Sequence, residues 1–215
     1  MPPHNQAIKD VARESLDHLS KVHTAREQAF PLSRKTIHLC SSSIRAAHRQ
    51  EFQQSRSLAD QAGALLDQIR EALKDNPALY YTGYVADAQK EYVEARAVLA
   101  FLADDPLPTP GDLKVEVAPY LNGLAEAASE LRRSILDALR RDDIAPCEAW
   151  METMDDVYTI LVSIDFPDAI TGGLRRTTDQ LRGVLERTRG DFTMALRQNA
   201  LERRLAGIDP SANGP

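Results

Sequence analysis

The sequence has few of the features that stabilise a fold covalently or anchor it in a membrane. Only two of its 215 residues are cysteines, Cys40 and Cys147, and neither belongs to a C-x-x-C or Cys/His metal pattern, so we expect reduced thiols. The longest apolar run, 97–103, is far shorter than the roughly 20 residues that cross a bilayer. The first ten residues lack the basic and apolar regions of a signal peptide. We therefore expect a soluble, cytoplasmic protein with no membrane contact.

Alternating β-branched runs are nearly absent as well, which argues against strands. Apolar residues recur instead at three- and four-residue steps along most of the chain, the spacing of amphipathic helices. The sequence predicts an all-α bundle of six to seven long antiparallel helices. We expect one domain over 1–206 and a disordered tail over 207–215.

Proline, glycine and aspartate clusters divide the expected helices. The first covers about 7–28 and would bury Ile8, Val11, Leu16, Leu19 and Val22. Pro31 is expected to open the second, because proline is tolerated in a first turn. The expected ranges from there on are about 31–74, 78–103, 118–141, 147–164 and 172–205, with 104–111 as the clearest loop.

The charge is distributed unevenly along the chain. The formal net charge is -6, which argues against attraction of nucleic acid by the whole surface. Residues 1–58 carry a net charge of +4, residues 59–165 of -12 and residues 166–215 of +2. Basic ends around an acidic centre would suit phosphate contacts beside a metal site, and the alternative is a set of solvated helix faces.

Two expected helices carry paired glutamates. Glu91 and Glu94 are separated by three residues, and Glu126 and Glu130 by four, so each pair projects from one side of its helix. Both pairs adjoin apolar stripes, where a carboxylate must be neutralised by a proton, a basic partner or a cation. No Glu-x-x-His is present, which argues against a di-iron bundle. An all-oxygen site suits Mg²⁺, with Mn²⁺ as the alternative.

The bland alternative is that these acids face solvent or pair with Arg96, Arg132 and Arg133. Small residues beside the second pair, Gly123, Ala127 and Ser134, would let a helix or ligand approach.

At these residues the sequence resembles the translin family, and its catalytic branch, translin-associated factor X, more than translin. The segment 89–95, QKEYVEA, is similar to that branch's Gln-Glu-Tyr-Val-Glu-Ala stretch apart from Lys90, and it follows a Tyr-Tyr pair at 80–81. The segment 120–126, YLNGLAE, resembles a Tyr-Leu-x-Gly-Val-Ala-Asp segment, with Glu126 in place of the aspartate. The similarity covers roughly 16–198 and includes a basic helix near the start.

The resemblance implies a translin-like fold, a closed oligomer such as an octamer or hexamer, and Mg²⁺-dependent endonuclease activity on single-stranded or exposed RNA strands. The family's catalytic and metal-binding acids carry over to Glu91, Glu94, Glu126 and Glu130. The change at position 126 keeps the charge but lengthens the side chain, which affects the geometry around Mg²⁺. The expected contacts to RNA, or alternatively DNA, are Arg26, Arg34, Lys35, Arg45 and Arg49.

Several neighbouring residues keep two interpretations. His48 adjoins the basic row and is either an RNA contact or a structural residue. The pair 172–173, Gly-Gly, before Arg175 would cradle a phosphate or simply end a helix. Trp150, Met151 and Met154 are expected in the core or a subunit contact.

Two rival functions remain beside the nuclease. One is a non-catalytic binder of single-stranded nucleic acid with the same fold, and the other is a helical scaffold that binds protein only.

Overall fold

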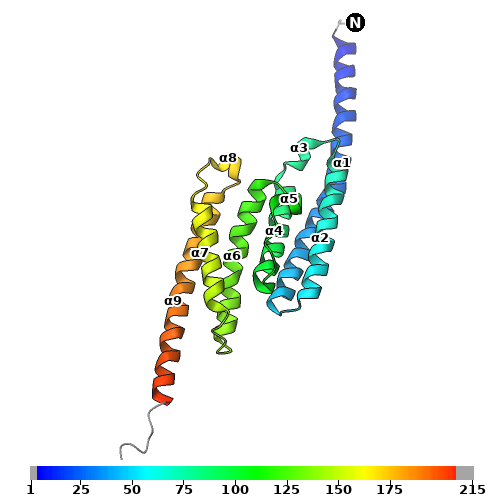
Figure 1. The fold of residues 1–215 in the computed structure, drawn as a ribbon. Helices are drawn as coiled ribbons and strands as arrows, with labels where there is room; N and C mark the ends of the chain where they lie inside the picture. Colours follow the sequence, from blue (N-terminus) through cyan, green and yellow to red (C-terminus); the bar gives the residue numbers. More distant parts are fainter. Residues whose placement is uncertain (1–3, 207–215) are drawn as a thin grey trace, which may run out of the picture.

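The computed structural model describes residues 4–206 and is all-helical over that range, which confirms the predicted fold class (Figure 1). Six of its helices are long: α1 Asn5–His48, α2 Phe52–Leu73, α4 Gly83–Ala103, α6 Val117–Leu139, α7 Cys147–Val162 and α9 Leu174–Ala206. Three four-residue helices lie in the connections: α3 Pro77–Tyr80, α5 Pro110–Leu113 and α8 Asp168–Thr171. The tail predicted for 207–215 lies outside the described residues.

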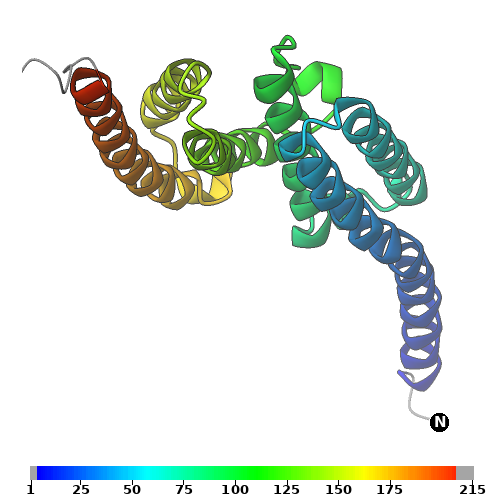
Figure 2. The ribbon, with the colours of Figure 1, turned by 90° about the horizontal axis from the view of Figure 1, so that it is seen from below.

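The long helices form two layers (Figure 2). One layer is a row in the order α1, α4, α6 and α9, in which each helix packs against the next. In the other layer α2 packs against α1 and α4, and α7 packs against α6 and α9. Side chains from all six helices fill the core, where burying each large aliphatic side chain contributes roughly 1.5–3 kcal/mol. The helices α4 and α6 therefore lie at the centre of the row.

Neighbouring helices are not all antiparallel, because α4 and α6 run in the same direction. The segment 104–116 carries the chain back along the molecule before α6 begins, and Glu116 donates its backbone N–H to the side chain of Gln89 at 2.9 Å. Further along, Gly123 lies against Lys90 and Val93. The two helices thus advance together, so their glutamate pairs lie at matching heights.

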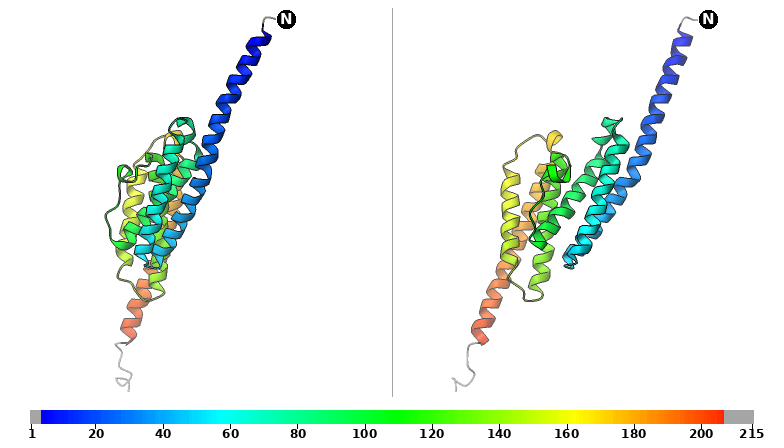
Figure 3. Two further views of the ribbon diagram at one scale, coloured as in Figure 1. Left: turned by 90° about the vertical axis from the view of Figure 1, so that its right-hand side faces the viewer. Right: turned by 45° about the vertical axis from the view of Figure 1, so that its right-hand side comes forward.

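Both end helices extend beyond the row, at opposite ends of the molecule (Figures 1 and 3). The predicted buried side of the first helix is wrong, since Ile8, Val11, Leu16 and Leu19 are 60–68% exposed. Burial along α1 begins only at Ala25, where the helix reaches the rest of the bundle. No helix within residues 4–206 is both long enough and apolar enough to cross a membrane.

The helix break expected before Pro31 is also wrong, because α1 continues through this proline. A proline inside a helix costs roughly 3 kcal/mol or more. Here the packed side of the helix continues through Ala29 and Ser33, and the hydroxyl of Ser33 donates to the Phe30 carbonyl at 2.8 Å. The chain turns instead at 49–51, where Gln50 has a φ of 62°.

The remaining helix bounds differ from prediction mainly before α4 and α6. The helix expected from residue 78 is divided, since α3 ends at Tyr80 and α4 begins at Gly83. The loop expected over 104–111 ends two residues earlier, because α5 begins at Pro110 and its start is held by a reciprocal cap between Thr109 and Asp112. The helices α6 and α7 agree with prediction within two residues. The glycines 172–173 have positive φ and separate α8 from α9. They therefore end a helix, which is the second of the two interpretations given above.

Three neighbouring side chains of α7 that were expected in the core or in a subunit contact lie in or against the core, and both cysteines lie there too. Met151 and Met154 are buried, and Trp150 packs partly buried against the same cluster. Cys40 and Cys147 are free and buried, and burial raises the pKa of the Cys147 thiol to about 11. Neither thiol is therefore placed for reaction with solvent.

Candidate metal centre

The approach of α4 to α6 depends on Gly123. A Cβ atom at this position would lie 2.4 Å from the Lys90 carbonyl oxygen and 2.8 Å from Val93 Cβ. Such distances are too short for any side chain, so glycine allows the two backbones to come close. Glu126 follows one turn later on α6, and Glu94 follows Lys90 by four residues on α4. The close crossing therefore brings the two acidic pairs together.

Three carboxylates converge at this crossing. Glu91, Glu94 and Glu126 each place one oxygen within 4.8 Å of the others. Glu91 and Glu126 remain partly open to solvent, with side chains 25% and 32% exposed. Helical spacing predicted that each pair projects from one side of its helix, and only the family resemblance implied that the two pairs share one site.

The fourth glutamate lies beside the group and is held by a histidine from α1. His48 Nε2 is 2.8 Å from Glu130 Oε2, and His48 Nδ1 is 3.0 Å from the hydroxyl of Ser134. This hydrogen bond lowers the pKa of Glu130, although burial acts in the opposite direction. The imidazole is only 2% exposed, so His48 orients Glu130 rather than contacting RNA directly.

Within the cluster, the ionised form of Glu94 is unfavourable. Burial raises the pKa of this carboxyl to about 8, and repulsion from Glu91, Glu126 and Glu130 adds to the effect. Burial also raises the pKa of Glu91, although the charge of Lys90 counteracts it. Glu94 thus holds its proton near neutral pH unless a positive charge replaces it.

Within residues 4–206 no arginine forms an ion pair with these acids, contrary to the alternative of arginine partners, although the charge of Arg133 helps to lower the pKa of Glu130. Arg96 pairs with Asp60 at 3.0 Å, and Arg132 pairs with Asp191 at 2.8 Å. The cation in contact with the cluster is Lys90, whose Nζ lies 2.7 Å from Glu126 Oε1 and 3.8 Å from Glu91 Oε1.

The residues present fit a hard divalent cation. All three converging donors are carboxylate oxygens, which Mg²⁺ and Mn²⁺ prefer over softer metals. Partial exposure of Glu91 and Glu126 leaves room for the waters that Mg²⁺ retains. Glu91, Glu94 and Glu126 are therefore the residues that would hold the ion, with Glu130 at its side.

The predicted nucleic-acid contacts are all exposed on α1 or at its end, but they do not share one face. Arg34 and Arg45 are eleven residues apart, about three turns, and align on the side of the helix that leads to His48. Lys35 lies about 100° round the helix from Arg34. The other two side chains are engaged locally, Arg26 with Glu27 and the Phe30 ring and Arg49 with Glu51.

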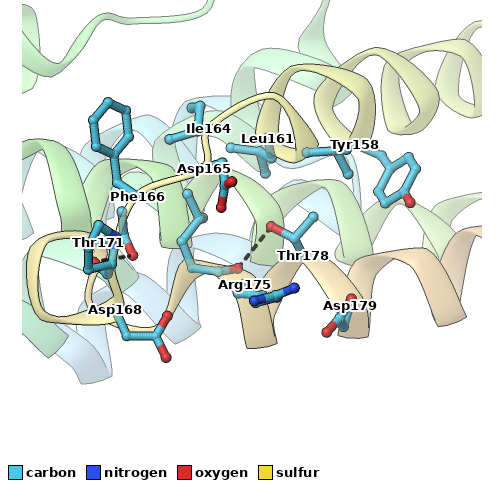
Figure 4. A pocket seen from close by; sticks show the side chains of 13 residues that line it. Tyr158, Leu161, Ile164, Asp165, Phe166, Asp168, Thr171, Arg175, Thr178 and Asp179 are labelled. Atoms are coloured by element: carbon cyan, nitrogen blue, oxygen red, sulfur yellow. Dashed lines mark hydrogen bonds between the residues drawn. The ribbon is translucent and has the colours of Figure 1, made fainter.

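A cavity of about 820 Å³ lies away from these carboxylates, between the end of α7, α8 and the start of α9 (Figure 4). Tyr158 and Phe166 line it together with Asp165, Asp168 and Arg175, and none of the four glutamates contributes to it. Size alone therefore does not locate the chemistry, and we assign the candidate centre from the converging side chains.

Comparison with known proteins gives a consistent picture. No protein-family model matches the chain. Among curated sequences, the uncharacterized protein MJ0175 of Methanocaldococcus jannaschii is 29% identical over 198 residues, which covers 90% of this chain and 86% of that protein. The solved structure of apo-NeC3PO is 20% identical with a TM-score of 0.75, covers 91% of this chain and 98% of that chain, and supports the fold alone.

Two structures of AfC3PO carry the similarity further. Each is 30% identical and covers 87% of this chain and 97% of AfC3PO, with a TM-score of 0.80 for the protein alone and 0.81 for its complex with duplex RNA. Fold and sequence agree over nearly the full length of these proteins. The resemblance expected from the sequence is thus confirmed at the level of the family, and the chain belongs to the translin family, together with the prokaryotic-type C3PO proteins.

Proposed function

We propose that this protein is a Mg²⁺-dependent endoribonuclease of the translin and C3PO type, acting on single-stranded or exposed RNA strands within a closed oligomer. The observation that carries the proposal is the convergence of three carboxylates within 4.8 Å on two central helices. The complex of AfC3PO with duplex RNA supports RNA as the ligand. Resemblance to the catalytic branch of the family supports hydrolysis rather than binding alone.

The residues of the cluster have distinct roles in this proposal. A bound Mg²⁺ would supply a water of lowered pKa and would stabilise charge on the scissile phosphate. Glu91, Glu94 and Glu126 would hold the ion, and Glu94 would have to release its proton to do so, because its pKa is raised to about 8. The hydrogen bond with His48 lowers the pKa of Glu130, so its carboxylate would be the group that accepts a proton from the attacking water.

The basic residues of α1 would hold the RNA backbone next to this centre. Arg34 and Arg45 lie on the side of α1 that leads to His48, and hence towards Glu130. Lys35 lies further round the helix, and Arg26 and Arg49 are engaged with Glu27 and Glu51, so these three would contribute by general attraction of phosphate. DNA is the alternative ligand, because contacts to phosphate do not distinguish the two.

Self-association is part of the proposal, with an octamer or hexamer as the expected closed form. The exposed apolar side of α1, formed by Ile8, Val11, Leu16 and Leu19, supports it. These side chains lie beyond the bundle, and an exposed apolar side of this kind is typical of a surface that another subunit covers.

A cleavage assay tests the nuclease directly. Purified protein would be incubated with end-labelled single-stranded and duplex RNA in Mg²⁺, Mn²⁺ or EDTA. We expect cleavage only with a divalent ion, and loss of cleavage but not of RNA binding in Glu126→Gln. The matched control is Glu152→Gln, which removes an exposed carboxylate of α7. Cleavage retained by Glu126→Gln, or unaffected by EDTA, would refute the assignment.

The second candidate is a non-catalytic RNA-binding protein of the same fold. The observation in its favour is the ion pair of Lys90 with Glu126, which neutralises one carboxylate without any metal. Such a protein would shift RNA on a gel equally with Mg²⁺ or EDTA and leave it intact. A scaffold that binds protein only would give no RNA shift in either condition.

A further inference from the structure

The cation inside the acidic cluster comes from the chain itself. Lys90 lies one residue before Glu91 on α4, and its side chain reaches across to α6. Its Nζ forms an ion pair with Glu126 at 2.7 Å and lies 3.8 Å from Glu91. The side chains of Lys90 and Glu126 are 25% and 32% exposed, so the pair is only partly shielded from solvent. The ammonium therefore contacts two of the three carboxylates that converge.

A lysine ammonium and a divalent ion compete for the same negative charge. If Glu126 bound a metal while keeping Lys90, two cations would lie on one carboxylate and repel each other strongly in a partly desolvated site. The side chain of Lys90 has four methylene groups and can rotate its ammonium towards solvent. Departure of Lys90 from Glu126 is therefore the least costly way to admit the ion.

We propose that Lys90 is a resident counter-cation of the candidate metal centre, which holds Glu126 in the metal-free protein and is displaced from it when a divalent ion binds. The inference rests on the proposed metal function and adds a positioning residue that sets the affinity for the ion. Lys90 is also the residue at which the 89–95 segment departs from the related Gln-Glu-Tyr-Val-Glu-Ala stretch, so this counter-cation is not part of that stretch.

The arrangement has a consequence for selectivity. To displace Lys90, an ion must interact with the three carboxylates more favourably than Lys90 does with Glu126. A monovalent ion carries only the single positive charge that Lys90 already provides. A divalent ion has charge enough to engage Glu94 as well, a third carboxylate with which Lys90 forms no ion pair. The centre should thus reject Na⁺ and K⁺ at cellular concentrations.

The test is the affinity of the purified protein for Mn²⁺, measured by the loss of the free-ion electron paramagnetic resonance signal. Lys90→Gln should bind Mn²⁺ about fivefold more tightly or better, the ratio that corresponds to removing an ion pair of about 1 kcal/mol. Lys90→Arg keeps the charge and should bind like the original protein. Lys74→Gln, which removes a lysine paired with Glu71 at the end of α2, is the control and should change nothing.

The outcomes separate this inference from the proposed function. Equal or weaker Mn²⁺ binding by Lys90→Gln, with binding by the original protein intact, overturns the role of Lys90 alone. Absence of Mn²⁺ binding in the original protein and in Lys90→Gln overturns the metal centre itself. Lys90→Met is a second neutral variant, and circular dichroism verifies that each variant is folded. Tighter binding by either folded neutral variant, and not by Lys90→Arg, supports displacement.

Discussion

Replacing Glu94 with glutamine should stabilise the metal-free protein at neutral and alkaline pH. The folded-state pKa of Glu94 is about 8, against 4.5 for the exposed group. Between these pH values the folded protein binds a proton that the unfolded chain releases. The stability that this proton provides is fully present below the unfolded pKa, and it is lost as the pH rises through the folded pKa.

The size of the effect follows from the shift. Each pKa unit corresponds to about 1.4 kcal/mol, so the free energy of unfolding should fall by about 3 kcal/mol between about pH 5 and about pH 8. Glutamine has nearly the same shape and does not ionise, so Glu94→Gln removes this loss. In a domain of this size, 1 kcal/mol shifts the Tm by roughly 2–4 °C, and the variant should melt about 6–12 °C higher at pH 8.

Thermal unfolding followed by circular dichroism in EDTA measures this difference. Glu152→Gln on the exposed side of α7 should follow the original protein at every pH. Adding Mg²⁺ should raise the Tm of the original protein more than that of Glu94→Gln, since the variant has lost a ligand. A variant that melts no higher than the original protein at pH 8 would refute the account of an uncompensated buried carboxyl.

Three further predictions concern the surroundings of the cluster. His48→Ala should lower the free energy of unfolding by about 2 kcal/mol at pH 7 in urea titrations. The difference should shrink as the pH falls below the ordinary pKa of glutamate, because the hydrogen bond with His48 stabilises the ionised form of Glu130, which is lost in acid. A difference that stays constant with pH would contradict the pairing of His48 with Glu130. Leu16→Asp with Leu19→Asp should reduce the mass measured by light scattering without loss of helicity, and an unchanged mass would exclude this side of α1 from the interface. Arg34→Gln with Arg45→Gln should weaken RNA binding and make the salt dependence shallower by about 1.4–1.8 in log–log slope, whereas an unchanged slope would place the RNA elsewhere.

The sequence predicted the helices wherever apolar periodicity and breakers coincide. The helices α6 and α7 match prediction closely, because apolar stripes run between clear loops there. Pro31 led to the wrong prediction of a helix start, which is where proline normally lies. In α1 the packing of the buried side outweighs the hydrogen bond that the proline removes. The turn at 49–51 contains neither glycine nor proline, so nothing in the local sequence signals it. The apolar side at the start of α1 was real, but periodicity cannot say whether a stripe faces its own core or another subunit.

The sequence predicted the acidic residues of the candidate site but not the basic residues that pair with them. Helical spacing placed Glu91 with Glu94 and Glu126 with Glu130, and the family resemblance linked the two pairs. Which basic groups reach them depends on how α1, α4 and α6 pack. Lys90 stood out only as a departure from the related segment, and the long-range pairing of His48 with Glu130, 82 residues apart, has no local signal.

The measurement that tests the central claim most directly is anomalous diffraction from crystals of the protein grown with Mn²⁺. The account predicts an anomalous peak among the carboxylate oxygens of Glu91, Glu94 and Glu126, with the ammonium of Lys90 moved away from Glu126. Mn²⁺ bound elsewhere on the protein, with the ion pair of Lys90 and Glu126 intact at a saturating concentration, would contradict it.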